Sequence, residues 1–344
     1  MIDLRSDTVT KPTQAMLQAM FAAQVGDDVF SEDPTVNLLQ MRCAELFGHE
    51  DALFCPSGTM ANQIAIKAHT QPMDEIILSD TAHIYYYETA AYAFHSGVSV
   101  KLIKGDRGIF TADDVLENIQ PDFDWLPKTS LVCLENTHNK GGGSCYTLEN
   151  MQAIRNVCLD KNLKTHIDGA RIFNAIIAKG YSALEVGEQC DSISVCFSKG
   201  LGAPIGSVLV GSKAFIRKAR RIRKAFGGGM RQTGFLAAAC LYALDHHIER
   251  LKEDHEHAQL LADCLNNLSW VKGVLQPDTN IVIFETDAEK TTVESVLGYL
   301  KAHDILATAF GKNQIRLVTH LEINREAIKT VIRTLGDWLI VIRE

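Results

Sequence analysis

Short apolar runs that alternate with helical patterns constrain the fold of this chain more than any other feature. Between residues 50 and 211 the runs are ALFC (52–55), EIILS (75–79), VSVKLI (98–103), SLVCLEN (130–136), KTHID (164–168), SISVCF (192–197) and GSVLVG (206–211). Such runs, separated by helices, are typical of a parallel sheet that is buried on both faces. Thr111 and Thr147 each precede a helical pattern and are expected to begin helices. The sequence therefore predicts an α/β domain with a mostly parallel, doubly wound sheet.

A second, smaller unit is expected after this region. Residues 235–268 have the pattern of long helical structure, and NIVIFE (280–285), ILATAF (305–310) and QIRLVTH (314–320) look like strands around a helix at 291–303. We therefore expect a large α/β domain over residues 46–245 and a small α+β domain over residues 246–344. Residues 1–45 are expected to pack on these domains or on a partner subunit.

Composition narrows the classes of function. At 344 residues and 46% hydrophobic content, the chain is long enough for two domains. Its net charge of -8 argues against a general nucleic-acid binder, which needs a basic surface, so small molecules are the expected partners. No stretch approaches the ~18 apolar residues of a membrane span. Nine cysteines without a CxxC pair suit a reducing compartment, and we expect a cytoplasmic location.

Small and polar residues follow several of the predicted strands. Ser57, Gly58 and Thr59 stand between the first run and a helical pattern. Backbone N–H groups at such a helix start can form a cradle for an anion, although the same residues would also serve as an ordinary helix cap. His83 follows the second run and could act as a base, a ligand or a flat stacking surface.

The later runs are followed by charged residues. Asp168 ends the fifth run, Arg171 comes three residues later, and Lys199 follows the sixth run within CFSKGLGAPIG (196–206). Ligands bind at the carboxyl ends of the strands in open α/β sheets, and one β-α-β unit separates Asp168 from Lys199. A phosphate cradle, a stacking ring, a carboxylate for a pyridine nitrogen and a lysine for a Schiff base are what pyridoxal 5'-phosphate requires. Jointly these residues predict that cofactor, whereas Lys199 alone is equally well explained as a solvated strand-end lysine.

Two other segments suggest different functions. The histidine-rich stretch DHHIERLKEDHEH (245–257) places His255 and His257 on different faces of a helix, so we expect no metal site there. The basic run RKARRIRK (217–224) could bind an anionic partner. Phe215, Ala219 and Ile222 recur at helical spacing, which favours an amphipathic helix whose basic face is solvated or turned toward an anionic site.

Motifs spread along the chain carry a resemblance to a known family. They are LRSDTVTKP at the N-terminus, GDDVFSEDPTVN (26–37), PSGTMAN (56–62), LENTHN (134–139), HIDGARIFNA (166–175), FSKGLGAPIGS (197–207), GGGMRQ (227–232) and IRLVTH (315–320). In residues, order and spacing they resemble the low-specificity L-threonine aldolases. The resemblance covers nearly the whole chain and implies the architecture of fold-type I pyridoxal-phosphate transferases.

The resemblance implies roles in binding the cofactor. Lys199 would hold pyridoxal phosphate covalently, Asp168 would pair with its pyridine nitrogen, and His83 would stack on its ring. Gly58 and Thr59 would bind its phosphate. The catalytic set would then be Lys199, His83 and Asp168.

The resemblance also implies how a substrate is held. Ser6, Arg171 and Arg316 would bind the substrate carboxylate, with Arg171 also close to the cofactor. Arg231 would reach the phosphate in a neighbouring subunit, so a homodimer or homotetramer with shared active sites is expected. The implied reaction is cleavage of L-threonine or L-allo-threonine to glycine and acetaldehyde.

Two other functions stay open at this point. A related β-eliminating lyase would share the cofactor residues and differ in the pocket around the β-carbon. A binding protein without catalytic activity, using the basic segment at 217–224 to hold an anionic partner, would need no cofactor.

One residue departs from the family pattern. In PDFDWLPKTSL (121–131) the family usually has a histidine where this chain has Trp125, and that histidine is thought to contact the β-hydroxyl of the substrate. The indole N–H only donates, so Trp125 cannot accept the hydroxyl proton, which would pass to His83 or to a water near the phosphate. We expect Trp125 to orient the hydroxyl or to line an aldehyde pocket, unless a loop shift moves it into packing.

Overall fold

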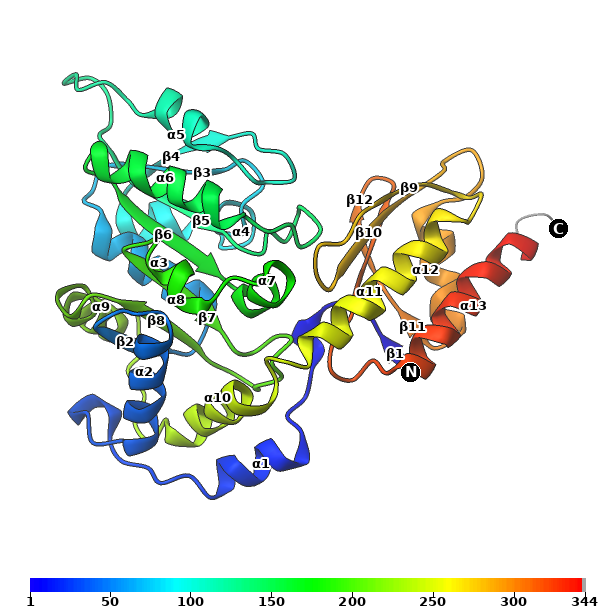
Figure 1. Ribbon diagram of the computed structural model, residues 1–344, viewed down its shortest axis with the longest axis horizontal. Coiled ribbons are helices and arrows are strands. Elements are labelled where there is room, and N and C mark those ends of the chain that lie inside the picture. Colours follow the sequence, from blue (N-terminus) through cyan, green and yellow to red (C-terminus); the bar gives the residue numbers. More distant parts are fainter. Residues whose placement is uncertain (342–344) are drawn as a thin grey trace.

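The computed structural model describes residues 1–341 and has two lobes, joined by a long helix and by the N-terminal segment (Figure 1). The larger lobe contains a seven-stranded sheet in the order β2-β8-β7-β6-β5-β3-β4. Its strands are β2 (Asp51–Cys55), β3 (Glu75–Ser79), β4 (Ser99–Ile103), β5 (Thr129–Glu135), β6 (Lys164–Gly169), β7 (Ser192–Cys196) and β8 (Ser207–Gly211). Each predicted apolar run is one of these strands, so this prediction is confirmed.

One strand of this sheet, β8, runs against its neighbours. It pairs antiparallel with β2 and β7, whereas β7·β6, β6·β5, β5·β3 and β3·β4 are parallel pairs. The sheet is therefore mostly parallel, as predicted. The connection from β7 turns the chain back along β7, and Lys199 lies in this connection.

Helices cover both faces of the sheet, which explains why its strands are apolar throughout. Ile77 and Val132 face a core shared with α2 (Pro34–Leu46), α6 (Leu148–Asp160) and α10 (Gly234–His246). Their neighbours Ile76 and Leu131 face the opposite side and pack with Ile66 of α3 (Gly58–His69). The other helices of this lobe are α4 (His83–Tyr86), η3 (Tyr92–Ser96), α5 (Ala112–Asn118), α7 (Ile172–Lys179), α8 (Ala183–Gly187) and α9 (Lys213–Ala225).

The predicted helix starts at Thr111 and Thr147 are confirmed. Thr111 caps α5 and accepts a hydrogen bond from the Asp114 N–H, and Thr147 caps α6 and accepts one from the Asn150 N–H (3.2 Å each). A threonine hydroxyl satisfies an N–H group that the first helical turn leaves without a partner.

The smaller lobe is built on a four-stranded antiparallel sheet in the order β12-β13-β10-β9. Its elements are α11 (Leu251–Asn266), β9 (Val271–Leu275), β10 (Ile281–Thr286), α12 (Val293–Ala302), β12 (Thr308–Gly311), β13 (Gln314–Val318) and α13 (Arg325–Val341). The strands predicted at 280–285 and 314–320 and the helix at 291–303 are confirmed. The single strand predicted at 305–310 is instead two short strands, β11 (Ile305–Leu306) and β12, which belong to different sheets, and β9 and α13 were not predicted. Leu251 in the first turn of α11 belongs to the core of the larger lobe, and Ala258 and Leu261 belong to the core of the smaller one. The helix α11 thus links the two cores.

The N-terminal segment contacts both lobes. β1 (Ile2–Asp3) pairs in parallel with β11 (Ile305–Leu306), and Leu4 lies in the core of the smaller lobe. After η1 (Asp7–Val9), α1 (Gln14–Phe21) packs against α10 and places Met16 in the larger core. The segment then passes through η2 (Asp28–Phe30) into α2. Residues 6–10 therefore cross from one lobe to the other.

The basic run at 217–224 forms part of α9, and the amphipathic pattern is confirmed because Ile216 and Ala219 are buried. One arginine of this run is neither solvated nor turned toward a ligand site. Arg223 is buried and donates to Asp28 Oδ2 (2.5 Å) and to the Phe54 carbonyl (2.6 Å). The carboxylate that holds it comes from a distant part of the sequence.

Among the helices of residues 1–341, we find none with the length and apolar composition that crossing a membrane requires.

Candidate active site

Two adjoining cavities lie where β6 and β7 end. The inner cavity has a volume of 170 Å³ and the outer cavity 380 Å³, and Thr8, His83 and Lys199 border both. Of the residues predicted from the sequence, Gly58, Thr59 and Asp168 line the inner cavity and Ser6, Arg171 and Arg316 line the outer one. Because Lys199 and His83 stand at the junction, a molecule in the inner cavity could react with one in the outer cavity.

The start of α3 forms one end of the inner cavity. The Ser57 hydroxyl caps the helix by accepting a hydrogen bond from the Met60 N–H (3.1 Å). Gly58 and Thr59 open the helix, where N–H groups have no partner within it. These donors together suit an anion such as a phosphate.

Asp168 presents a fixed carboxylate to the inner cavity. It lies in β6 and is 2% exposed. Its Oδ2 accepts a hydrogen bond from Asn62 Nδ2 (3.0 Å) and its Oδ1 accepts one from the Ala170 N–H (3.1 Å). The carboxylate is thereby held in one orientation, and it can accept from a cationic ring nitrogen.

His83 follows β3 and is held by two glutamates. Its backbone N–H donates to Glu135 Oε2 (2.6 Å), and its Nδ1 lies 3.2 Å from Glu88 Oε1. Burial lowers the pKa of His83, but the hydrogen bond to Glu88 and the charge of Asp168 outweigh burial and raise that pKa above its ordinary 6.5. An Nδ1–H that donates to Glu88 leaves Nε2 as the proton acceptor of the ring.

The same groups have donor types that a metal ion could use. One ligand atom each of His83, Glu88 and Asp168 lie within 4.8 Å of one another. Amide hydrogens already point at these oxygens, because Asn62 Nδ2 donates to both Glu88 and Asp168 (3.0 Å each) and Gln63 Nε2 donates to Glu88 (2.6 Å). The cluster therefore fits cationic hydrogen-bond donors better than a metal ion.

The connection between β7 and β8 fixes the backbone of Lys199. The Lys199 carbonyl accepts hydrogen bonds from the Gly202 N–H (2.8 Å) and from Thr10 Oγ1 (2.9 Å). The Phe197 N–H donates to the Gly206 carbonyl (3.0 Å), which closes the loop. Gly202 has a φ of 77°, a conformation that glycine adopts without strain. The loop thus holds the lysine at the junction of the cavities.

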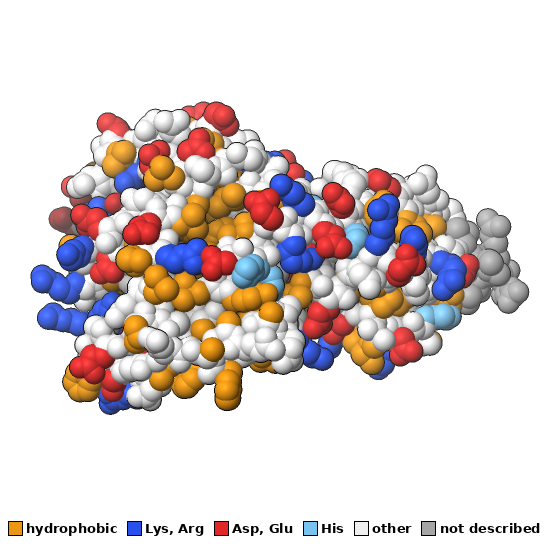
Figure 2. All heavy atoms as spheres, turned by 60° about the horizontal axis from the view of Figure 1, so that its bottom comes forward, with side chains coloured by type: hydrophobic (Ala, Val, Ile, Leu, Met, Phe, Trp, Pro, Cys, Tyr) orange, Lys and Arg blue, Asp and Glu red, His pale blue; other side chains and the backbone are white. Residues whose placement is uncertain are grey.

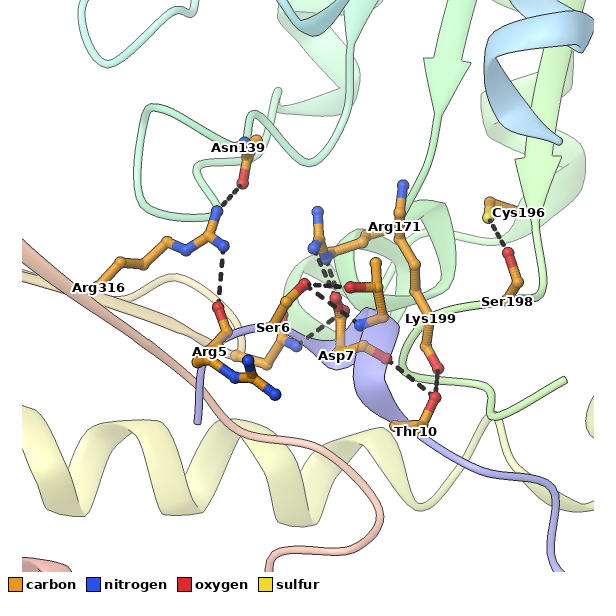
Figure 3. A network of polar contacts seen from close by, with 12 residues as sticks. Arg5, Ser6, Asp7, Thr10, Asn139, Arg171, Cys196, Ser198, Lys199 and Arg316 are labelled. Carbon is orange, nitrogen blue, oxygen red and sulfur yellow. Dashed lines mark hydrogen bonds and ion pairs between the residues drawn. The ribbon is translucent and has the colours of Figure 1, made fainter. Parts of the chain in front are cut away.

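Arg171 directly precedes α7 and forms a buried ion pair with Asp7 of the N-terminal segment (Figure 3). Its Nε and Nη2 donate to the two carboxylate oxygens at 2.7 and 2.6 Å. Burial alone would raise the pKa of Asp7, but the charge of Arg171 lowers it to about 2. The Nη1 group has no acceptor among the described residues, so it remains available to a ligand in the outer cavity.

Arg316 reaches the outer cavity from β13 of the smaller lobe. Its Nη1 donates to Asn139 Oδ1 (2.9 Å) and its Nη2 to the Arg5 carbonyl (3.0 Å), as Figure 3 shows. Its guanidinium carbon lies 4.8 Å from the centre of the Phe310 ring. Burial and the nearby charge of Arg171 lower the pKa of Arg316 to about 10. Within residues 1–341 no carboxylate pairs with Arg316, so its charge can attract an anion into the outer cavity.

Of the remaining predicted residues, Ser6 borders the outer cavity and Trp125 and Arg231 lie elsewhere. Ser6 Oγ accepts hydrogen bonds from the Thr8 N–H (3.2 Å) and hydroxyl (2.9 Å). Neither Trp125 nor Arg231 borders the two cavities of the single chain. The Trp125 indole is 76% exposed and stacks on Phe123 with ring centroids 4.8 Å apart, and Arg231 Nη1 donates to Asp27 Oδ2 (2.8 Å).

Several cavity residues were not predicted from the sequence, namely Thr8, Asn62, Tyr87, Glu88, Asn139 and Phe310. Asn62 and Asn139 lie inside the motifs PSGTMAN and LENTHN, which could have indicated them. Tyr87, Glu88 and Phe310 carry no local signal, because an aromatic or acidic residue in a loop or strand is common.

Comparisons with known proteins place this chain in a family. The sequence model of the β-eliminating lyase family matches residues 3–289. The low specificity L-threonine aldolase of Escherichia coli (strain K12) is 44% identical over 333 residues, which cover 96% of this chain and 97% of that protein. The low-specificity L-threonine aldolase 1 of Arabidopsis thaliana is 39% identical, with 100% and 98% covered. The solved structure of a threonine aldolase from Leishmania major shares the fold, with a TM-score of 0.84 at 19% identity over 98% of this chain and 100% of that one. The chain therefore belongs to the β-eliminating lyase family.

Proposed function

We propose that this protein cleaves L-threonine, L-allo-threonine or both to glycine and acetaldehyde with pyridoxal 5'-phosphate as cofactor. The family supports the proposal, since full-length relatives bear the name L-threonine aldolase. One observation carries it further. Lys199 stands between two cavities. The inner one has a carboxylate and a cradle for an anion, and the outer one has two arginines. A cofactor and an amino acid would meet at that lysine.

The inner cavity has the groups that the cofactor needs. The N–H groups of Gly58 and Thr59 at the start of α3 suit its phosphate. Asp168 would pair with its pyridine nitrogen, and Lys199 would hold its aldehyde carbon. When bound, pyridoxal phosphate supplies an electron sink for the electron pair that remains when the Cα–Cβ bond breaks.

The outer cavity matches the charge of one carboxylate. Asp7 neutralises Arg171, whereas Arg316 keeps its charge. A substrate carboxylate placed between Arg171 Nη1 and Arg316 would balance that charge and could accept a hydrogen bond from the Ser6 hydroxyl, which borders the same space. Holding the carboxylate at two points fixes the direction of the Cα–Cβ bond relative to Lys199.

Removal of the β-hydroxyl proton is assigned to His83 Nε2 or to a water that it binds. Glu88 keeps Nδ1 engaged, so Nε2 can accept a proton, and the raised pKa of His83 makes the ring a stronger base. Trp125 would act only by orienting or enclosing the aldehyde part of the substrate.

The protein is further proposed to be a homodimer or homotetramer whose subunits share active sites. Arg231 lies on the surface of its own chain, where it could reach the phosphate in a neighbouring subunit. Hydrophobic side chains gather on the face that α1, α2 and α10 form (Figure 2). They include Phe21, which is 91% exposed, and Met41, which is 51% exposed. Apolar surface of this kind is typical of contacts between subunits. A monomer in sedimentation analysis would contradict the proposal.

Location and domain limits complete the proposal. The scattered cysteines suit a cytoplasmic protein, which fractionation of cells would test. The domains are proposed to be residues 46–245 and 246–344, with residues 1–45 joining them. Limited proteolysis tests the boundary between the two domains. Cleavage outside residues 240–251 would place that boundary elsewhere.

The decisive experiment is product analysis. The purified protein, loaded with pyridoxal phosphate, is incubated with L-threonine and then with L-allo-threonine, and acetaldehyde, glycine and 2-oxobutyrate are measured. Acetaldehyde and glycine in equal amounts support the aldolase. Formation of 2-oxobutyrate alone would instead identify a β-eliminating lyase, and the absence of both cofactor binding and products would favour a binding protein.

A further inference from the structure

A chain of buried hydrogen bonds runs from Asp168 away from both cavities. Asp168 is bonded to Asn62 (3.0 Å), and Asn62 is bonded to His166 (3.1 Å). His166 is bonded to Ser192 (2.9 Å), which is bonded to His69 (2.8 Å). Asn62 and Asp168 are at most 2% exposed, and His166 and Ser192 are fully buried. We call these five residues the Asp168 relay.

Chemistry fixes the direction of each hydrogen bond. Asn62 must turn its Nδ2 hydrogens to the carboxylates of Glu88 and Asp168, because its oxygen would be repelled there. Its Oδ1 therefore accepts from His166 Nε2, and it also accepts from Ser194 Oγ (2.7 Å). All four hydrogen-bonding positions of the amide are thus satisfied, so its orientation depends on these donors.

The outer part of the relay follows from this orientation. His166 donates through Nε2, so its Nδ1 accepts the Ser192 hydroxyl hydrogen. Ser192 Oγ then accepts from His69 Nε2. Burial lowers the pKa of His166 to about 4 and that of His69 to about 3, so both rings are neutral at neutral pH. Every hydrogen bond of the relay therefore points toward Asp168.

The outer end of the relay lies at a different cavity. His69 stacks on Phe215 with ring centroids 4.4 Å apart, and both line a 480 Å³ cavity together with Arg155, Lys164 and Lys218. That cavity shares no residue with the inner or outer cavity. His69 therefore touches neither of the cavities assigned to cofactor and substrate.

We propose that His166, Ser192 and His69 are positioning residues, which hold the Asn62 amide so that Asp168 stays in place as the ionised partner of the cofactor's pyridine nitrogen. The inference rests on the proposed function. Hydrogen bonds that follow one another in a chain polarise one another in a buried site, so a chain whose last donor meets a carboxylate stabilises its charged form. A line of apolar residues of similar volume would fill the same space without stabilising that charge, so packing alone does not account for the relay.

Two variants of His69 separate hydrogen bonding from packing. His69→Phe keeps the stack on Phe215 but removes the donor to Ser192, whereas His69→Gln keeps an amide donor and loses the stack. We expect His69→Phe to weaken binding of pyridoxal phosphate by about threefold or more, the scale of one lost buried hydrogen bond, and His69→Gln to restore it. The reverse order would show that His69 acts through packing and would overturn the inference.

Ser192→Ala tests the middle of the relay. It removes the hydroxyl that joins the two histidines, and we expect the dissociation constant of pyridoxal phosphate to rise by about tenfold. Ser96→Ala is the matched control, because Ser96 is 1% exposed and its hydroxyl has no partner among the described residues. The control should bind the cofactor like the wild type.

The measurement is the dissociation constant of the full-length protein for pyridoxal phosphate, read from the absorption band of the bound cofactor. Thermal unfolding of each cofactor-free variant shows whether a weaker affinity is only a loss of fold. Wild-type affinity in Ser192→Ala and His69→Phe would overturn the inference and leave the proposed function intact. A wild-type protein that binds no pyridoxal phosphate would overturn both.

Discussion

Arg171 and Arg316 approach the outer cavity from different lobes and are held differently, so their replacement by lysine should have different effects. A lysine has a single ammonium group and cannot reproduce the planar fork of an arginine. For Arg316→Lys we expect KM for threonine to rise by about tenfold and kcat to fall as well, since orientation of the substrate is part of catalysis. Steady-state kinetics with kcat and KM close to those of the wild type would remove Arg316 from the site.

For Arg171→Lys the same kinetic loss should come with a loss of stability. The buried Asp7 carboxylate would lose one of its two hydrogen bonds from the guanidinium. Losing one buried hydrogen bond to a charged group costs about 2 kcal/mol, which urea unfolding can measure with Arg316→Lys as the comparison. Equal unfolding free energies of the two variants would show that the ion pair between Arg171 and Asp7 does not stabilise the fold.

Trp125→His tests the residue in which this chain departs from its family. If the indole faces the β-carbon, a histidine there would supply a second proton acceptor and change the ratio of kcat/KM for L-threonine and L-allo-threonine. The exposed stack of Trp125 on Phe123 would also be lost. An unchanged ratio would mean that Trp125 does not face the substrate, in agreement with its absence from the outer cavity of the single chain.

At the scale of single residues, reactive groups are easier to predict from the sequence than the residues that hold those groups in place. Lys199, Asp168 and Arg171 follow strands whose ends could be located from apolar runs. Asp7, by contrast, lies in a segment without periodic pattern, and its ion pair with Arg171 depends on how that segment crosses between the lobes. Contacts between residues so far apart in sequence leave no local pattern to read.

At the scale of elements, the residue that caps the start of α2, Asp33, accepts four backbone hydrogen bonds. Asp33 Oδ1 accepts from the Thr35 and Val36 N–H groups (3.1 Å each), and Oδ2 accepts from Gly26 (3.3 Å) and Gly234 (2.8 Å). Since Gly234 is the first residue of α10, one fully buried carboxylate joins two helices and the N-terminal segment.

Asp33→Asn should therefore be more damaging than the loss of an ordinary cap. The side-chain NH₂ group of asparagine would face backbone N–H groups that Asp33 now accepts from. We therefore expect the free energy of unfolding to fall by on the order of 3 kcal/mol. Thr111→Ala, which removes an exposed cap, should cost only about 1 kcal/mol in the same urea titration. Similar losses in both variants would show that the extra bonds of Asp33 add little.

The elements also show where prediction from sequence ends. Buried strands read as apolar runs whichever way they point, so the reversed direction of β8 could not be seen. β9 is mostly exposed or half-buried and lacks a continuous apolar run, which explains why it was missed. Strand existence follows from local burial, whereas strand direction and order follow from contacts across the molecule.

For the whole molecule, mixing of inactive subunits tests the sharing of active sites. Lys199→Ala should abolish turnover, because within residues 1–341 Lys199 is the one lysine that lines the two cavities. Arg231→Ala should weaken cofactor binding in the neighbouring subunit. Subunits of the two variants, dissociated and reassembled together, should regain part of the activity, because one site in each mixed pair has both residues. If the mixture is no more active than its components, Arg231 acts within its own chain.

Stability should depend on pH through buried neutral histidines. Burial lowers the pKa of His69 from 6.5 to about 3, so between these values the unfolded chain binds a proton that the folded protein does not. Stability is therefore complete above pH 6.5 and falls as the pH drops, by about 1.4 kcal/mol per pH unit for each such group. His69→Phe should flatten the dependence of unfolding free energy on pH below 6 by about that amount. Equal slopes in variant and wild type would show that His69 is protonated in the folded protein.

The place of β2 in the sheet has a consequence for synthesis on the ribosome. β2 ends at Cys55 and is an edge strand. Among the strands of the described residues it pairs only with β8, which begins at Ser207. A growing chain therefore carries an apolar strand with an unpaired edge until most of the larger lobe has been translated, and such edges readily pair with other chains. Helices α2 and α3, which flank β2 in sequence and pack against it, are available early to shield its faces but not its hydrogen-bonding edge. Nascent chains arrested before residue 207 should consequently depend on chaperones far more than chains released after residue 211.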